Sequence, residues 1–351
     1  MIYDVVIIGA GVTGCCIARE LSRMKLSVLL TERENDVSCG ATRANSAIIH
    51  AGYDPEPGTL MARLNVEGNR MTEDICRELD VPFRRIGSLV LAFDGEELKT
   101  VEKLYHRGVA NGVPGLRLIG RDELRALEPN VSEDAVGALL APSAGIINPW
   151  EYAVAMAENA VHNGAHYRLR FRTTAIAREN GVFTVASGSG ESVRARYVVN
   201  AAGTHSAEIA RLGLFGESED PGFRIIPSKG QYYLLDKSQG GLFGRVMFQC
   251  PSNVGKGVLV APTVHGNLIA GPDAVDVADP DDTGTTRSAL DFVRKMASRT
   301  TGAINYRDNI RNFAGIRANS DRSDFIIEAS PVEQRFINVA GIKSPGLSSA
   351  P

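Results

Sequence analysis

The stretch Val5-Val6-Ile7-Ile8-Gly9-Ala10-Gly11-Val12-Thr13-Gly14 decides the fold class of this chain. Its four β-branched residues in a row are typical of a parallel strand that is buried on both faces. The strand runs into a Gly-x-Gly-x-x-Gly motif, and a helical pattern follows over residues 15–24. In such a motif Gly9 permits a tight turn, Gly11 lets a pyrophosphate approach the backbone, and Gly14 lets the helix pack closely on the strand. The N–H groups at the start of the helix then face the phosphates.

A second strand supports this interpretation. Residues 27–31 follow the helix and end at Glu32, which lies 18 positions after Gly14. A carboxylate about 20 residues beyond the glycines is the group that binds the ribose in dinucleotide sites. A glycine-rich turn alone is a weak signal, but the order strand, glycine turn, helix, strand and acidic residue predicts a dinucleotide-binding site.

The composition limits the class of protein. The chain has 351 residues, 44% of them hydrophobic and 23% charged, which is ordinary for a soluble α/β protein and long enough for two domains. A net charge of −3 gives no reason to expect a nucleic-acid partner. The N-terminus has no signal-peptide pattern, and the longest apolar run, 135–147, is too short to cross a bilayer. No transmembrane segment is therefore expected, and peripheral contact with a membrane stays open.

The five cysteines are odd in number and contain no C-x-x-C pair. They give no pattern for a disulfide framework or a zinc site. We therefore expect no metal and a cytoplasmic location.

Periodicity predicts the other elements. Strands separated by glycine turns from 167 to 200 are typical of a β-meander that ends in a buried strand at 197–200. The acidic run 273–282 is expected to be a solvated loop, and 312–319 a small-residue turn centred on an arginine. Helices are predicted at 58–79, 95–111, 121–127, 151–163 and 286–297, and further strands at 88–93, 230–235, 258–261, 268–271, 324–328 and 336–340.

Five motifs occur together and in order, and they cover nearly the whole chain. They are the glycine motif with Glu32, segment 40–52, Val198–Gly203, Gly315-Ile316-Arg317 and Gly341–Gly346. Together they resemble the D-amino-acid oxidase superfamily of FAD-dependent oxidoreductases.

Two shorter motifs resemble one branch of that superfamily. Ala44-Asn45-Ser46-x-x-x-His50-Ala51-Gly52 and Ser228-Lys229-Gly230 look like the FAD-dependent glycerol-3-phosphate dehydrogenases. The L-2-hydroxyglutarate dehydrogenase branch shares the His-Ala-Gly element, so the branch is less specific than the superfamily.

The resemblance implies an α/β fold in which a doubly wound, Rossmann-like FAD/NAD(P)-binding domain carries a second, mixed α+β substrate domain. The FAD-binding domain would be discontinuous, with residues 1–82, 146–206 and 311–351. The substrate domain would contain residues 83–145 and 207–310. Changes in the residue pattern at these positions agree with the division.

The resemblance also implies which residues bind FAD. The glycine motif would hold the pyrophosphate, Glu32 the adenosine ribose, and the C-terminal segment the flavin, where a helix dipole stabilises the reduced anion. The full set would be Gly9, Gly11, Gly14, Glu32, Arg33, Thr42, Arg43, Asn45, Ser46, Ala175, Ala202, Gly203, Gly341, Gly346 and Leu347.

Three residues are candidates for the chemistry. Oxidising a secondary alcohol at a flavin requires a base for the hydroxyl proton and cationic anchors for an anionic substrate. His50 is the candidate base, because an imidazole titrates near pH 6.5. Arg317 is the candidate bidentate clamp on a phosphate or carboxylate, and Lys229 is a second anchor. His205 and Tyr232 could also line the cavity. Each of the three candidates also has a simpler interpretation: His50 as a packed histidine, Arg317 as part of a structural salt bridge, and Lys229 as an exposed lysine.

The expected reaction is hydride transfer to FAD from a small anionic secondary alcohol, first of all from sn-glycerol 3-phosphate to give dihydroxyacetone phosphate. The electrons would pass to a quinone or another acceptor. The alternatives are an L-2-hydroxyglutarate or other 2-hydroxy-acid dehydrogenase, an amine or amino-acid oxidase, an NAD(P)-binding protein, and a non-enzymatic redox-sensing or scaffold module. The end of the chain at Pro351 resembles a helix start, so the native chain is expected to continue, and whether a C-terminal helix or an iron–sulfur module follows stays open.

Overall fold

Strand β1 (Ile2–Ile8) forms from the predicted β-branched run and lies inside an eight-stranded sheet. Its neighbours are β2 (Val28–Thr31) on one side and β12 (Ser192–Asn200) on the other, both parallel to it. Helix α1 (Val12–Ser22) connects β1 to β2 and packs on the sheet together with α5 (Pro149–His162). This is the doubly wound arrangement that the glycine motif predicts. The structure is a computed structural model that describes residues 1–216, 220–251 and 257–351.

The rest of the first sheet is partly parallel and partly antiparallel. One edge is the meander β10–β11–β12, and the opposite edge is β9, which runs parallel to β2. The C-terminal half of β12 pairs in parallel with β20, which in turn pairs with β19. The bounds of these strands are β9 His166–Arg168, β10 Thr173–Glu179, β11 Val182–Ser187, β19 Ile326–Ser330 and β20 Glu333–Ala340.

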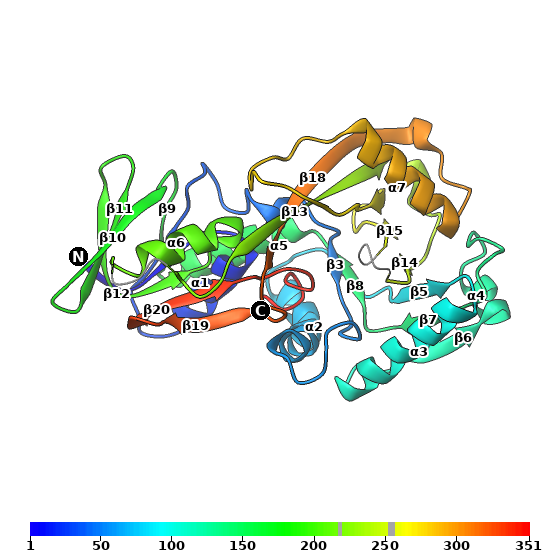
Figure 1. Cartoon of the computed structure of the whole chain (residues 1–351), viewed down its shortest axis with the longest axis horizontal. Helices are drawn as coiled ribbons and strands as arrows, with labels where there is room; N and C mark the ends of the chain where they lie inside the picture. The colour runs from blue at the N-terminus through cyan, green and yellow to red at the C-terminus, as the bar shows by residue number, and fades with distance from the viewer. Residues whose placement is uncertain (217–219, 252–256) are drawn as a thin grey trace.

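The second sheet has nine strands and lies on the right of Figure 1. Its order is β17-β13-β16-β15-β14-β5-β7-β6, and β18 pairs with β13. Helices α3 (Gly95–Ala110), α4 (Arg121–Leu127) and α7 (Arg287–Thr300) belong to the same part of the chain. The strands are β5 Ser88–Ala92, β6 Arg117–Gly120, β7 Gly137–Ala141, β13 Ile225–Leu235, β14 Val246–Gln249, β15 Leu259–Pro262, β16 Leu268–Gly271, β17 Val275–Asp276 and β18 Asn309–Ser320.

A small sheet lies between the two large ones. It consists of β3 (Ile48–Ile49), β8 (Gly145–Ile147) and β4 (Phe83–Arg84), with helix α2 (Leu60–Glu78) beside it in Figure 1. Of the helices in the described part of the chain, none is both long and apolar enough to cross a membrane.

The structure confirms the fold class and corrects several boundaries. Residues 312–319 are not a turn, because β18 pairs with β13 along its whole length, from Ile225 opposite Ser320 to Leu235 opposite Asn309. The first ten residues of the predicted segment 311–351 therefore belong to the second sheet. Helix α6 (Ser206–Leu212) packs on β10, β12 and β20, so the start of segment 207–310 belongs to the first sheet.

The meander also differs from its prediction in detail. The region 167–176 is split, because β9 pairs with β2 while β10 begins the antiparallel meander. The buried strand predicted at 197–200 is the end of a longer continuous strand, β12, which begins at Ser192. The C-terminal residues 344–349 form turns.

Candidate functional site

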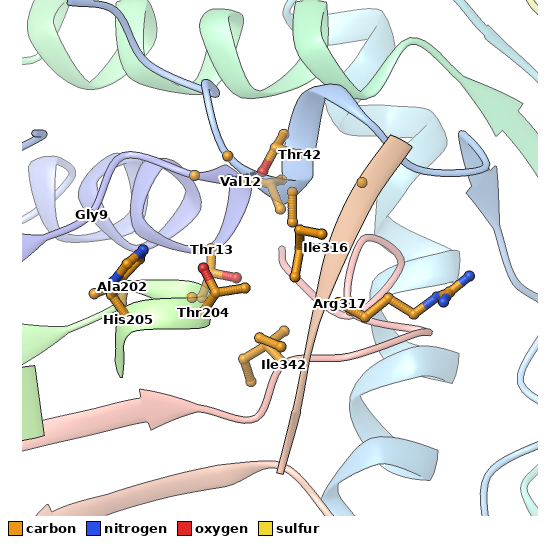
Figure 2. Close-up of a pocket in the computed structure, with 18 of the residues that line it drawn as sticks. Gly9, Val12, Thr13, Thr42, Ala202, Thr204, His205, Ile316, Arg317 and Ile342 are labelled. Carbon is orange, nitrogen blue, oxygen red and sulfur yellow. Dashed lines mark hydrogen bonds between the residues drawn. The ribbon is translucent and has the colours of Figure 1, made fainter. Parts of the chain in front are cut away.

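A long cavity runs between the two large sheets, and chain segments far apart in sequence line it (Figure 2). The segments are the start of α1, the end of β2, η1 (Ala41–Arg43), η2 (Gly203–His205), β18 and the residues after β20. The empty volume is about 1730 Å³, which includes some open solvent. Its lining reaches from the end of β2 past the start of α1 to β18 and the residues after β20, so the cavity suits an extended ligand rather than a compact one.

The glycine motif forms one wall of the cavity by close backbone contact. Gly9 has φ +104°, and a Cβ there would lie 2.5 Å from the carbonyl oxygen of Ala201. A Cβ on Gly14 would overlap the carbonyl oxygen of Gly9. Gly11 is the N-cap of α1 and gives it no side-chain cap, so the N-terminal turn of the helix, at the positive end of the helix dipole, borders the cavity.

Replacing Gly14 with alanine is therefore expected to lower the free energy of unfolding by about 3 kcal/mol and to reduce cofactor content. The added methyl group meets backbone, which can move aside only by separating α1 from β1. Thermal unfolding and the flavin absorbance of the purified variant measure the two effects. Gly95→Ala is the control, because a Cβ on Gly95 would meet no atom within 4 Å. If Gly14→Ala unfolds like the control, the close packing at Gly14 is not needed for stability.

Two polar side chains complete this end of the cavity. The Thr42 hydroxyl accepts the N–H of Val12 at 2.9 Å, so its own proton can be donated into the cavity. The Glu32 carboxylate accepts the N–H of Ala10 at 2.8 Å and of Glu34 at 3.0 Å, which orders the turns after β1 and β2. Each carboxylate oxygen can still accept a hydrogen bond from a ribose hydroxyl. Donors for phosphate and an acceptor for ribose thus lie along one wall.

The segment after η1 is held by its own side chains. Asn45 donates to the carbonyl of Thr42 at 2.7 Å and accepts the N–H of Ala47 at 2.8 Å. Ser46 lies 3.0 Å from the hydroxyl of Tyr232, whose ring stacks on Phe313 with a centroid distance of 4.7 Å. The segment is therefore held against the second sheet, through Tyr232 of β13, which in turn packs on Phe313 of β18.

His50 follows β3 and is fixed at both its backbone and its ring. Its N–H donates to Ser348 Oγ at 2.7 Å, and its carbonyl accepts from the side chains of Asn65 and Asn69 at 2.8 and 2.9 Å. The ring stacks on Phe248 at 5.6 Å, and Nε2 lies 3.3 Å from Ser344 Oγ. The imidazole therefore has one orientation in the cavity.

Arg317 projects from β18. In Figure 2 it and His205 lie at opposite ends of the group of labelled side chains. Its Nη2 donates to the carbonyl of Asp273 at 3.1 Å. Its Nη1 is buried and has no hydrogen-bond partner among the described residues. The side chain lies over Gly230, where a Cβ would overlap the guanidinium. Because a buried, unpaired guanidinium N–H is costly, this atom indicates a position for an anion.

All of the predicted site residues lie in the described part of the chain. Most of them line the cavity, but five do not. Gly14 and Gly341 lie behind its walls, and Arg43 is exposed to solvent. Ala175 is exposed on β10, and the cavity instead reaches Phe171, Arg172 and Thr173, just before it in the chain. Lys229 is buried in an ion pair with Asp282, with a distance of 2.7 Å.

The sequence interpretation missed the residues that hold His50. Asn65 and Asn69 are buried on one face of α2, four residues apart. That spacing of two asparagines in an amphipathic helix is the only signal that could have indicated them. His205 and Tyr232, named only as further candidates, do line the cavity.

Comparisons with known proteins identify the family of the chain. Residues 4–351 match the model of the family DAO, described as FAD dependent oxidoreductase. The chain is 50% identical over 349 residues to the glycerol 3-phosphate dehydrogenase of Caloramator mitchellensis, which covers 99% of this chain and 72% of that protein. It is 31% identical over 288 residues to the human mitochondrial L-2-hydroxyglutarate dehydrogenase, which covers 78% of this chain and 61% of that protein.

A solved structure has the same fold. The dithionite-reduced L-α-glycerophosphate oxidase of Mycoplasma pneumoniae, with FAD bound, superposes with a TM-score of 0.93 at 30% identity, over 100% of this chain and 92% of that one. The match to the family model covers nearly the whole chain. The chain belongs to the DAO family of FAD-dependent oxidoreductases.

Proposed function

We propose that this enzyme is an FAD-dependent dehydrogenase that oxidises sn-glycerol 3-phosphate to dihydroxyacetone phosphate. The observation that carries the proposal is the buried Nη1 of Arg317, a cationic donor without a partner among the described residues, in the same cavity as His50. The relative at 50% identity is a glycerol 3-phosphate dehydrogenase, and the structural neighbour is a glycerophosphate oxidase. A phosphate with a secondary alcohol beside it supplies the anion for the one residue and the proton for the other.

The residues of the cavity fit FAD. The turn at Gly9 and Gly11 and the N-terminus of α1 would hold the pyrophosphate, because a side chain at Gly9 would collide with the facing backbone. Glu32 would accept from the ribose hydroxyls, and the free proton of Thr42 would be donated to a phosphate oxygen. Bound FAD supplies the hydride acceptor.

The chain's own residues do the remaining work. Arg317 binds the substrate phosphate and so orients the alcohol carbon. His50 accepts the hydroxyl proton at Nε2, the ring atom that faces Ser344. Its stacking on Phe248 and its contact with Ser344 hold the imidazole in place as it becomes charged, and the two asparagines fix the backbone that carries it.

Anaerobic reduction of the holoenzyme by different alcohols tests the proposed substrate. We expect glycerol 3-phosphate to bleach the flavin absorbance rapidly, and L-2-hydroxyglutarate, glycine and unphosphorylated glycerol to do so at least 100-fold more slowly, because they lack the phosphate or its spacing from the alcohol. Faster bleaching by L-2-hydroxyglutarate would overturn the choice of substrate. The reduced enzyme is then mixed with oxygen or a soluble quinone, and faster reoxidation by the quinone would support the proposed acceptor.

A further inference from the structure

Most residues of the loop between β16 and α7, which includes the short strand β17, are exposed as predicted, but three of its carboxylates tie it to the rest of the molecule. Asp273, at its start, is buried and accepts the backbone N–H of Gln231 at 2.6 Å and the side-chain Nε2 of the same residue at 3.0 Å. The Gln231 carbonyl oxygen Oε1 accepts the N–H of Thr286 at 2.6 Å, at the end of the loop. One buried side chain thus closes both ends of the loop 273–286.

Two adjacent aspartates near the end of this loop attach it to two different parts of the molecule. Asp282 accepts from Lys229 of β13 at 2.7 Å, inside the second sheet. Only 7% of the Lys229 side chain is exposed, and a buried ammonium requires such a partner. Asp281 turns the other way and contacts the first sheet.

Asp281 binds two residues of the cavity wall. Its Oδ1 lies 2.6 Å from Nη2 of Arg33 and 3.2 Å from Nε2 of His205. Arg33 follows directly on Glu32 at the end of β2, and both Arg33 and His205 line the cavity. The hydrogen bond from Arg33, followed by that from His205, lowers the pKa of Asp281 to about 2, so this carboxylate is charged at neutral pH.

We propose that Asp281 and Asp282 form a clasp that retains FAD, in which Lys229 fixes the loop to the second sheet and Asp281 fixes Arg33 and His205 over the adenosine end of the cavity. The inference concerns retention of the cofactor and does not depend on which alcohol is oxidised. It also gives Lys229 a role other than anchoring the substrate.

The position of the clasp explains how it slows release. Arg33 and His205 are neighbours of Glu32 along the wall where the ribose is expected, and Arg33 Nη1 lies 2.7 Å from His205 Nε2. Both side chains have other conformations available, and Asp281 selects the one that lies against the wall. Without that carboxylate Arg33 keeps its contact with Glu34 at 3.2 Å and His205 its contact with Glu208 at 3.3 Å, but neither is tied to the loop, so the two side chains move more easily away from the adenosine end.

The test is the rate at which FAD leaves the holoenzyme. After 100-fold dilution, the rise in fluorescence of released FAD gives the rate constant directly. We expect Asp281→Asn to release FAD about five-fold faster than wild type, equivalent to about 1 kcal/mol, and Lys229→Met about three-fold faster. Because salt screens exposed ion pairs, 1 M NaCl is expected to accelerate release from wild type more than from Asp281→Asn.

Asp276→Asn is the matched control. It removes one charge from the same loop, but Asp276 is exposed on β17 and its side chain is not part of the clasp. Asp281→Glu keeps the charge and is expected to recover part of the retention. Circular dichroism of each variant checks that the fold is intact.

The proposal is overturned if Asp281→Asn releases FAD at the rate of Asp276→Asn, or if salt accelerates both the wild type and Asp281→Asn equally. A higher KM for glycerol 3-phosphate in Lys229→Met, without faster FAD release, would return Lys229 to the substrate site. The proposed substrate is tested separately, since FAD release is measured without any alcohol.

Discussion

Replacing Arg317 with methionine is expected to raise the KM for glycerol 3-phosphate at least 100-fold. Methionine retains much of the volume of the side chain but removes the charge-assisted hydrogen bonds to the phosphate, each worth about 1.5–3 kcal/mol. The rate constant for flavin reduction at saturating substrate should fall less, because the reacting end of the cavity is unchanged. Arg317→Lys should recover only part of the affinity, because an ammonium cannot bind a phosphate through two parallel N–H groups. Steady-state kinetics with a soluble acceptor give both constants.

Arg311→Met is the control for this experiment. Arg311 lies on the same strand, β18, but it is exposed and does not line the cavity. It should keep the wild-type KM. If Arg317→Met also keeps it, the phosphate is bound elsewhere and the proposed substrate loses its main support. Thermal unfolding monitors the loss of the contact between Arg317 and the Asp273 carbonyl, which is a separate effect.

Replacing His50 with glutamine is expected to slow flavin reduction about 1000-fold at saturating substrate. Glutamine can hydrogen-bond to the alcohol but cannot take its proton at neutral pH, and general-base catalysis contributes about 10²–10⁴-fold. Anaerobic stopped-flow measurement of the flavin absorbance isolates this step. KM should change little, because Arg317 still binds the phosphate. The rate of the variant should also lose the pH dependence that a titrating base imposes on the wild type.

The matched control for this change is His106→Gln, because His106 is an exposed residue of α3 outside the cavity. FAD content and the flavin spectrum show whether His50→Gln still holds the cofactor, which its backbone contacts through Ser348, Asn65 and Asn69 should ensure. A reduction rate within three-fold of wild type would mean that another group takes the proton.

Local patterns predicted the elements next to the cofactor well. The β-branched run, the three glycines and Glu32 lie within one strand–helix–strand unit, so their structural roles depend on neighbours in sequence. Helix α4 (Arg121–Leu127) was predicted with its bounds, because an acidic first turn and a following proline mark both ends.

The prediction failed where small residues serve a long-range contact. The segment around Gly315 was interpreted as a turn because glycine and alanine are frequent in turns, yet these residues lie in β18. Their size is needed because β18 passes so close to Ala44 that a Cβ on Gly315 would overlap its carbonyl oxygen. Nothing near residue 315 in the sequence shows that Ala44 will lie there.

The partners of the charged residues could not be predicted for a similar reason. The sequence predicts Lys229 as a substrate anchor, whereas the structure pairs it with Asp282, 53 residues away in a run predicted to be solvated. Asp281 meets Arg33 across 248 positions. Ion pairs of this kind depend on how the two sheets are placed, which no local pattern records.

The contact between Gly315 and Ala44 has a consequence for the size of molecule that the enzyme accepts. Gly315 precedes Arg317 by two residues, and Ala44 precedes His50 by six, so this contact between main chains limits how far apart the segments that carry the two proposed substrate residues can lie. Side chains around the cavity can be exchanged without altering that limit. With the proposed roles of Arg317 and His50, homologous phosphates with a longer carbon chain between the alcohol and the anion are expected to react more slowly, and widening the range of substrates would require moving β18 as well as changing side chains.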